Sequence, residues 1–299
     1  MKTRYKVLLA LGGLIALAVI INFAFPSAGA NDEFAPQNEF LLEPWISLQL
    51  GAIDMSITKA VLYLVLACGG TVGAMLYIAK RMEDRPNRVQ TAVEAAYDLT
   101  RNQITRSNMD DSMALKWFPF VATLFFFIWF SNMVGYIPLP TNTEHAVDVF
   151  GAQIPSFALY AATANLSVPL VLTLMVWIAY HVEGVRVHGF VGYLKSWVPG
   201  GVSGPAAIPI FMIEAISQFV RIISLSVRLF ANILAGHLLI LFMGGGLVVL
   251  LGLAALGVFT LPLAVAFFMF EVGLIATLQA FIFATLTSIY LGGATAANH

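Results

Sequence analysis

The sequence predicts an all-α protein that crosses a membrane several times. Of its 299 residues, 60% are hydrophobic and only 10% are charged, whereas a soluble domain has about 25% charged residues. A spanning helix needs about 20 apolar residues. Five regions beyond the N-terminus meet that length, and they lie at residues 57–79, 115–139, 157–180, 206–243 and 247–292.

The N-terminus has the pattern of a secretory signal. Residues 1–30 begin with "MKTRYK", continue with a long apolar stretch and end in "PSAGA", which offers a small-residue cleavage site. We expect cleavage after Ala30. An uncleaved anchor, which would add a sixth span, is the alternative and leads to the same topology. Residues 31–56 are acidic and would form an external segment.

The polar region that follows the first span predicts a helix at the membrane surface, over about residues 86–109. Apolar residues recur there at near-helical spacing, namely Val89, Val93, Ala96, Leu99 and Ile104. An amphipathic helix of this kind lies with its apolar face against the membrane or the protein. A solvated connector helix is the alternative.

The basic residues orient the spans. Lysines and arginines cluster after the first span, at Lys80, Arg81, Arg85, Arg88, Arg101, Arg106 and Lys116. Arg186 and Lys195 follow the third span, whereas the loop at 140–156 has no lysine or arginine. Because basic loops stay in the cytoplasm, the tail at residues 293–299 is expected to be cytoplasmic.

The last two spans are too long for a bilayer. Residues 206–243 would form a helix of roughly 57 Å at 1.5 Å per residue, against a hydrocarbon core of about 30 Å. Residues 247–292 are longer still. Such helices must tilt or kink. We therefore expect a steeply inclined hairpin whose two helices are joined at "MGGG".

Charged residues lie inside the first of these long spans. Glu214, Arg221 and Arg228 are seven residues apart and so share one face of a helix. Glu214 and Arg221 could pair and simply fix helix packing. Arg228 has no acidic residue within one turn, although an arginine at the centre of a membrane helix costs about 2.5–3.5 kcal/mol. Its partner is therefore expected to come from elsewhere.

Other polar residues accompany Arg228. Ser224 and Asn232 lie one turn to either side of it. We place His237 and Ala235 on the opposite face, so that an imidazole and the arginine point in different directions.

Several function classes can be weighed against this pattern. The single cysteine, Cys68, excludes an intrachain disulfide and a multi-cysteine metal site, and we expect no cofactor and no nucleic-acid partner. A secondary transporter or channel in which Arg228 binds an anion is one alternative, although the inverted repeats of such transporters are not evident. A haem carrier is another, with His181 and His188 placed at or beyond the end of the third span.

Three sequence blocks resemble a known family. They are "SLSVRLFANILAGHLL" at 224–239, "LQAFIFATLTSIYL" at 278–291 and "SNMVGYIP" at 131–138. All three resemble subunit a of the F-type ATP synthase, the membrane stator subunit of its proton channel, except that Val227 replaces the usual leucine. The resemblance runs in order from about residue 57 to 292.

This resemblance implies a function and a set of partners. A member of the family is not itself catalytic; it provides two aqueous half-channels that couple proton movement to rotation of the c-ring for ATP synthesis. Arg228 would face a carboxylate on that ring. The other partners would be the peripheral-stalk b subunits and the rest of the synthase, in the lipid bilayer of a bacterial plasma membrane.

The resemblance also implies roles for individual residues. His237 and Glu271 would relay protons on the external side, and Gln279 and Asn232 would lie close to Arg228. Ser224 and Arg221 would line the cytoplasmic exit. Glu214, which sits where the family has a glutamate, would belong to the proton pathway.

Two departures from the family pattern affect these roles. Glu271 stands eight residues before Gln279 instead of seven, and the extra residue rotates Glu271 by about 100° unless a π-bulge absorbs it. Thr163 stands where many members have an aspartate, so the proton route there is expected to be rebuilt.

Overall fold

The structure confirms an all-α protein with several apolar helices long enough to cross a membrane. It is a computed structural model that describes residues 3–24, 40–42, 44–50, 53–81, 83, 85–149, 152–198 and 204–296. Within these ranges, the candidate spans are Lys59–Tyr77, Asp111–Gly135, Ser167–His188, Gly204–Leu251 and Ala254–Thr295. The proposed cleavage site after Ala30 lies outside the described residues.

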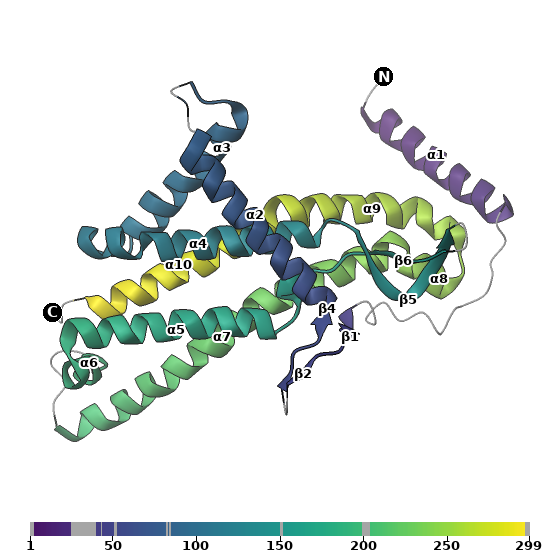
Figure 1. The fold of residues 1–299 in the computed structure, drawn as a ribbon. Coiled ribbons are helices and arrows are strands. Elements are labelled where there is room, and N and C mark those ends of the chain that lie inside the picture. Colours follow the sequence, from purple (N-terminus) through teal and green to yellow (C-terminus); the bar gives the residue numbers. More distant parts are fainter. Residues whose placement is uncertain are drawn as a thin grey trace.

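Four helices lie side by side and enclose the main core (Figure 1). These are α4 (Asp111–Gly135), α5 (Ser167–His188), α7 (Ala207–Leu241) and α10 (Ala276–Thr295). Large side chains from all four meet in one cluster, among them Phe125, Val176, Leu229 and Phe283. Helix α2 (Lys59–Arg81) crosses this group on α4, and α1 (Thr3–Ala24) stands apart from it in the same view.

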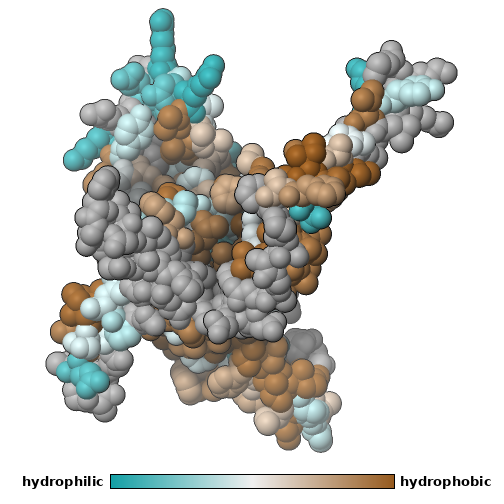
Figure 2. Space-filling view, turned by 90° about the vertical axis from the view of Figure 1, so that its right-hand side faces the viewer, coloured by the Kyte–Doolittle hydropathy of each residue, from teal (hydrophilic) through white to brown (hydrophobic). Residues whose placement is uncertain are grey.

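The predicted surface helix is present and is docked on the C-terminal helix. It comprises α3 (Arg88–Asp98) and the π-helical turn η2 (Leu99–Arg106). The Asn87 side chain caps it by accepting a hydrogen bond from the Gln90 N–H at 2.8 Å. Ile104 is fully buried, and its carbonyl accepts a hydrogen bond from the Ser288 hydroxyl at 2.9 Å. In Figure 2, hydrophilic side chains gather at the top, where α3 lies.

The chain reverses between the two long arms at Gly252. The structure shows that the predicted turn at "MGGG" is wrong, because α7 continues through the π-helical turn η5 (Phe242–Gly246) into α8 (Leu247–Leu251). Gly252 then adopts a left-handed conformation with φ 63°. Only glycine enters this region without a steric penalty, and it commonly ends helices in this way.

The second long arm is made of several helical pieces. The 3₁₀ turn η6 (Ala254–Leu256) leads into α9 (Gly257–Phe270), which contains Pro262. The π-helical turn η7 (Glu271–Ile275) then connects α9 to α10. The arm therefore stays helical across the candidate site, but its helical register shifts by one residue at η7.

The third span begins later than we expected. The expected start at residue 157 falls in β6 (Ala152–Ala158), which pairs with β5 (Leu139–Val149), and η3 (Ala162–Ala164) follows. Helix α5 starts at Ser167, whose N–H donates to the Asn165 side chain at 3.0 Å. Asn165, two residues earlier, thus satisfies the first free backbone N–H of the helix in an Asx turn.

The remaining elements are short. Four short strands before α2 form two small antiparallel pairs, and a short helix lies between α5 and α7. These elements are β1 (Pro44–Ile46) with β4 (Ile57–Thr58), β2 (Gln49–Leu50) with β3 (Ile53–Asp54), α6 (Phe190–Ser196) and the turn η4 (Gly204–Ala206).

A buried acid joins α4 to α5. Glu183 is only 1% exposed, and its carboxylate pairs with Lys116 and, at 3.7 Å, with Arg186. Loss of one partner of a buried ion pair costs about 3–5 kcal/mol. Lys116 is half-exposed and Arg186 remains, so we expect Lys116→Met to cost less, about 1–3 kcal/mol.

Thermal dissociation of the detergent-solubilised complex checks this prediction. Lys116→Met should release the subunit at a lower temperature, and adding Glu183→Leu should recover most of the loss because the buried charge is then gone. A double variant that is less stable than Lys116→Met alone would contradict the account.

Candidate functional site

Arg228 lies on an exposed face of α7. Its side chain is exposed, and no ion pair or hydrogen bond reaches it from the residues that the structure describes. Ser224 and Asn232 are exposed on the same face. Ala235 is exposed there too, so its placement on the opposite face is wrong: seven residues make nearly two full turns. An unpaired guanidinium inside an apolar span is available to a partner outside the chain.

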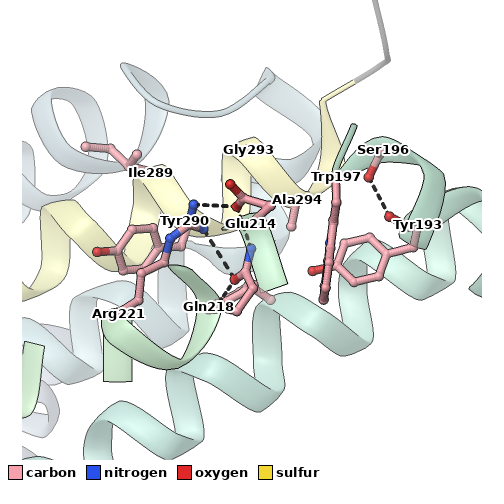
Figure 3. Close-up of a pocket in the computed structure, with 11 residues that line it drawn as sticks. Tyr193, Ser196, Trp197, Glu214, Gln218, Arg221, Ile289, Tyr290, Gly293 and Ala294 are labelled. Atoms are coloured by element: carbon pink, nitrogen blue, oxygen red, sulfur yellow. Dashed lines mark hydrogen bonds and ion pairs between the residues drawn. The ribbon is translucent and has the colours of Figure 1, made fainter. Parts of the chain in front are cut away.

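A polar cavity of about 350 Å³ opens near the start of α7, between α5, α6, α7 and α10 (Figure 3). Glu214 and Arg221 form an ion pair at 2.9 Å in its wall. Gln218 lies between them and donates to the Glu214 carboxylate at 2.8 Å. The Tyr180 hydroxyl in turn donates to Gln218 at 2.8 Å. Carboxylate, amide and hydroxyl groups thus form one connected wall.

Aromatic residues complete this cavity. The Arg221 guanidinium lies 5.2 Å from the centre of the Tyr290 ring, and Tyr193 and Trp197 line the side formed by α6 and the residue that follows it. Burial raises the pKa of the Tyr193 phenol, so that it remains neutral. Ser224 does not line the cavity. Of the two residues expected at the cytoplasmic exit, Arg221 therefore lines this cavity, together with Glu214, and Ser224 lies apart.

His237 occupies the opposite side of α7 and is fully buried. Its Nδ1 lies 3.0 Å from the Ile233 carbonyl oxygen and its Nε2 lies 3.1 Å from the Gly135 carbonyl oxygen. A neutral imidazole has one N–H and can satisfy one of these acceptors, whereas the protonated ring satisfies both. Each ring nitrogen of His237 therefore faces a carbonyl oxygen.

Glu271 lies beside His237 at the first residue of η7 and is 8% exposed. Its carboxyl group packs directly on Gly236, where any Cβ would collide with it. The Tyr136 hydroxyl donates to Glu271 Oε2 at 3.1 Å, and the Tyr136 ring stacks on the His237 ring with centroids 4.7 Å apart. A phenol, an imidazole and a carboxyl group thus form one buried cluster.

The π-helical turn absorbs the extra residue between Glu271 and Gln279. In η7 the Ala276 N–H donates to the Glu271 carbonyl, a bond that spans five residues instead of four. The eight residues from Glu271 to Gln279 therefore cover the same angle as seven residues of an α-helix. This is the π-bulge that the eight-residue spacing requires if Glu271 is to keep its orientation, which here is toward α7.

Sequence reasoning missed Tyr136 as a member of this cluster. It belongs to the block "SNMVGYIP", but nothing in its local pattern distinguishes it from an aromatic residue at the end of a span. Only the packing of α4 against η7 brings its hydroxyl to Glu271.

Gln279 and Thr163 occupy buried positions near these groups. Gln279 is 4% exposed, and across the described residues no hydrogen bond joins it to Arg228. Thr163, where an aspartate was expected, donates to Asn132 Oδ1 at 2.8 Å. The threonine therefore takes part in a hydrogen-bond network that continues from Asn132 to the Ala276 carbonyl.

His181 lies inside α5, and its placement at the end of the third span is wrong. Helix α5 continues to His188. The His181 ring packs against Trp177 and Tyr180, with centroids 4.1 Å and 4.5 Å apart, and its Nδ1 lies 2.9 Å from the Trp177 carbonyl oxygen. This packing indicates a structural role for His181 within the helix bundle. It does not favour His181 as a haem ligand.

The fold and these two clusters define a class. The chain is a multi-pass membrane protein in which titratable groups lie inside apolar spans, on either side of an arginine that has no partner among the described residues. Comparisons with known proteins identify the family. The family described as "ATP synthase A chain" matches residues 61–292, so the chain belongs to the family of ATP synthase A chains.

Individual relatives agree with this membership. ATP synthase subunit a of Rubrobacter xylanophilus is 35% identical over 252 residues, covering 83% of this chain and 88% of the relative. Subunit a of Hyphomonas neptunium is 32% identical (88% and 96% covered), and that of Brucella ovis is 34% identical (90% and 100% covered). The chain is accordingly a non-catalytic membrane component of ATP synthase that takes part in proton transport.

Proposed function

We propose that this subunit provides two separate aqueous half-channels, with Arg228 between them, that couple proton transport to rotation of a ring of c subunits. The observation that carries the proposal is Arg228, exposed on α7 inside an apolar span and without a partner among the described residues. The polar cavity around Arg221 and the buried cluster around His237 lie on either side of it along the helix.

The spacing along α7 separates the two regions. At 1.5 Å per residue, Arg221 lies about 10 Å before Arg228 and His237 lies about 13 Å after it along the helix axis. Together these positions extend over about 24 Å, most of a hydrocarbon core of about 30 Å. A proton that passes from one region to the other must therefore cross the level of Arg228.

The chemistry of arginine explains how the crossing is coupled to rotation. A carboxylate that faces lipid must be neutral, because a bare charge there is very costly. Opposite Arg228 the ionised carboxylate is stabilised by the nearby opposite charge. Each ring carboxyl group would therefore lose its proton into one half-channel as it reaches Arg228 and gain another from the second as it leaves.

The fixed charge also keeps the half-channels apart. A guanidinium does not deprotonate at any working pH, so Arg228 repels protons that would pass directly between the two regions. Asn232 and Gln279 would shape the junction next to it. Protons would then cross only on the ring, which is the condition for coupling.

The cluster of Tyr136, His237 and Glu271 would form the external relay. Histidine and a buried glutamic acid both accept and release protons near neutral pH in suitable surroundings. The Tyr136 hydroxyl bonds to one of them and its ring stacks on the other. It would link the two groups, which form no direct hydrogen bond or ion pair with each other among the described contacts.

The cavity around Glu214 and Arg221 would open to the cytoplasm. It lies near the C-terminal end of α10, since Gly293 and Ala294 line it. The surface helix that follows the basic segment also contacts this end, where Gly292 meets Asn108. Basic segments remain in the cytoplasm, which supports a bacterial plasma-membrane protein with a cytoplasmic tail. The family suggests the peripheral-stalk b subunits as further partners.

Disulfide crosslinking tests whether the Arg228 face meets the ring. In a background without Cys68, we expect cysteines at Ser224 and Asn232 to crosslink to cysteines near the ring carboxylate, because both positions are exposed on that face. Ser226→Cys is the matched control: Ser226 lies on α7 as well but is buried on the other side, and should not crosslink. Equal crosslinking at Ser224 and Ser226 would refute the orientation.

A further inference from the structure

Three side chains, two on α4 and one on the residue that caps its C-terminal end, contact the two ends of the π-helical turn η7, which begins at Glu271. Trp129, Asn132 and Tyr136 are spaced by three and four residues, so they lie above one another on the helix. Their polar atoms reach Thr277 and Ala276, the first two residues of α10, and Glu271, the first residue of η7, in that order. The contacts thus hold the chain on both sides of η7.

The three contacts are hydrogen bonds. The Trp129 indole N–H donates to the Thr277 hydroxyl at 3.1 Å. The Asn132 amide donates to the Ala276 carbonyl at 3.2 Å. The third is the bond from Tyr136 to Glu271, already described as part of the buried cluster.

Asn132 makes the central one of the three contacts. Thr163 of η3, which belongs to neither α4 nor α10, sets the orientation of its amide. The Thr163 hydroxyl donates to Asn132 Oδ1 at 2.8 Å. With that oxygen occupied as an acceptor, the Asn132 NH₂ must point toward the Ala276 carbonyl. Asn132, Thr163 and Ala276 are all fully buried, so water does not compete for these bonds.

Ala276 is the residue that closes the π turn. Its N–H donates to the Glu271 carbonyl, which is the wide hydrogen bond of η7. Its carbonyl is the group that Asn132 holds. π-Helical turns are rare compared with α-helical ones, and reverting to an α-helical bond here would turn Glu271 by about 100° away from Gly236.

We propose that Asn132, oriented by Thr163, is a positioning residue that stabilises the π turn at 271–275 and thereby keeps Glu271 beside His237. Trp129 adds a contact just beyond this turn, at Thr277. The inference rests on the proposed role of Glu271 in proton transport. It also accounts for Thr163, whose hydroxyl serves to orient an amide where an aspartate was expected.

A deletion provides the test. Removing Gly273 takes out the extra residue, so residues 271–275 can close as an ordinary α-helical turn while Glu271 and Gln279 keep their places. We expect Asn132→Leu to slow ATP-driven proton pumping about tenfold in the full chain and less than about twofold in the chain without Gly273. Ser131→Ala is the matched control, because Ser131 is the buried neighbour whose hydroxyl has no partner among the described residues, and it should have no effect.

Two outcomes would overturn the proposal. Equal slowing by Asn132→Leu in both backgrounds would show a general packing role. A structure of the Asn132→Leu complex adds a readout that does not depend on transport: loss of the bond between the Ala276 N–H and the Glu271 carbonyl supports the proposal, and its retention refutes it. If Glu271→Ala pumps normally, the transport role of Glu271 fails, and the structure of the variant still decides whether Asn132 holds the turn.

Discussion

Replacing Arg228 by lysine is expected to abolish both ATP synthesis and ATP-driven proton pumping, by at least about 100-fold. Lysine keeps a positive charge, but as a compact ammonium that readily loses its proton when buried and lacks the planar fork of donors. The exposed Arg228 has no partner among the described residues that would anchor a shorter side chain. Charge alone should therefore not support coupling.

Arg228→Ala separates the two roles of the residue. Without the cation, coupled transport should again be lost, while passive proton leak through membranes stripped of the catalytic sector should persist or increase. Arg101→Ala, which removes a half-buried arginine of the surface helix, should leave both measurements unchanged. Near-normal ATP synthesis by the lysine variant would show that the guanidinium is dispensable and would contradict the first prediction.

Replacing Gly236 by alanine is expected to slow proton pumping about tenfold or more without preventing assembly. The added Cβ would collide with the Glu271 carboxyl group. That group is the end of a flexible side chain, so it can swing aside at little cost to stability. It would then lose its place beside His237 and its hydrogen bond from Tyr136.

Matched variants isolate this effect. Gly244 follows α7 on the same long helical arm, and a Cβ added there meets nothing within 4 Å. The Gly244→Ala variant should therefore pump protons normally. His237→Ala and Glu271→Ala should each slow pumping at least as much as Gly236→Ala, since they remove the groups themselves. Normal pumping by Glu271→Ala would place the external relay on other residues, whatever Gly236→Ala does.

The two proposed half-channels differ in construction. The region around Arg221 is an open cavity whose charged groups are already paired, with Glu214 and Arg221 about one-third exposed. The region around His237 is a closed cluster in which Glu271 has no cationic partner among the described residues. Water can reach the first directly. Protons in the second must pass through side chains, which makes the exact placement of Glu271 more important there.

The sequence by itself determined the class of the protein, the number of long apolar helices and the face that carries Arg228. These features depend on composition and on helical period, which are local properties of the chain. The seven-residue spacing of Glu214, Arg221 and Arg228 suffices to place them on one side of α7. The match of short blocks to a known family depends on local residues in the same way.

Only the tertiary structure decided where the long arms turn and what surrounds Glu271. The glycines at 244–246 and at 252 have the same intrinsic propensity to end a helix. The chain reverses at Gly252 because that residue takes the left-handed conformation, whereas residues 244–246 continue the helix. Tyr136, Asn132 and Thr163 lie more than 100 residues from the segment they support. A π turn is locally less favourable than an α-helical turn, so contacts from distant parts of the chain must stabilise it. No local sequence pattern reveals those contacts.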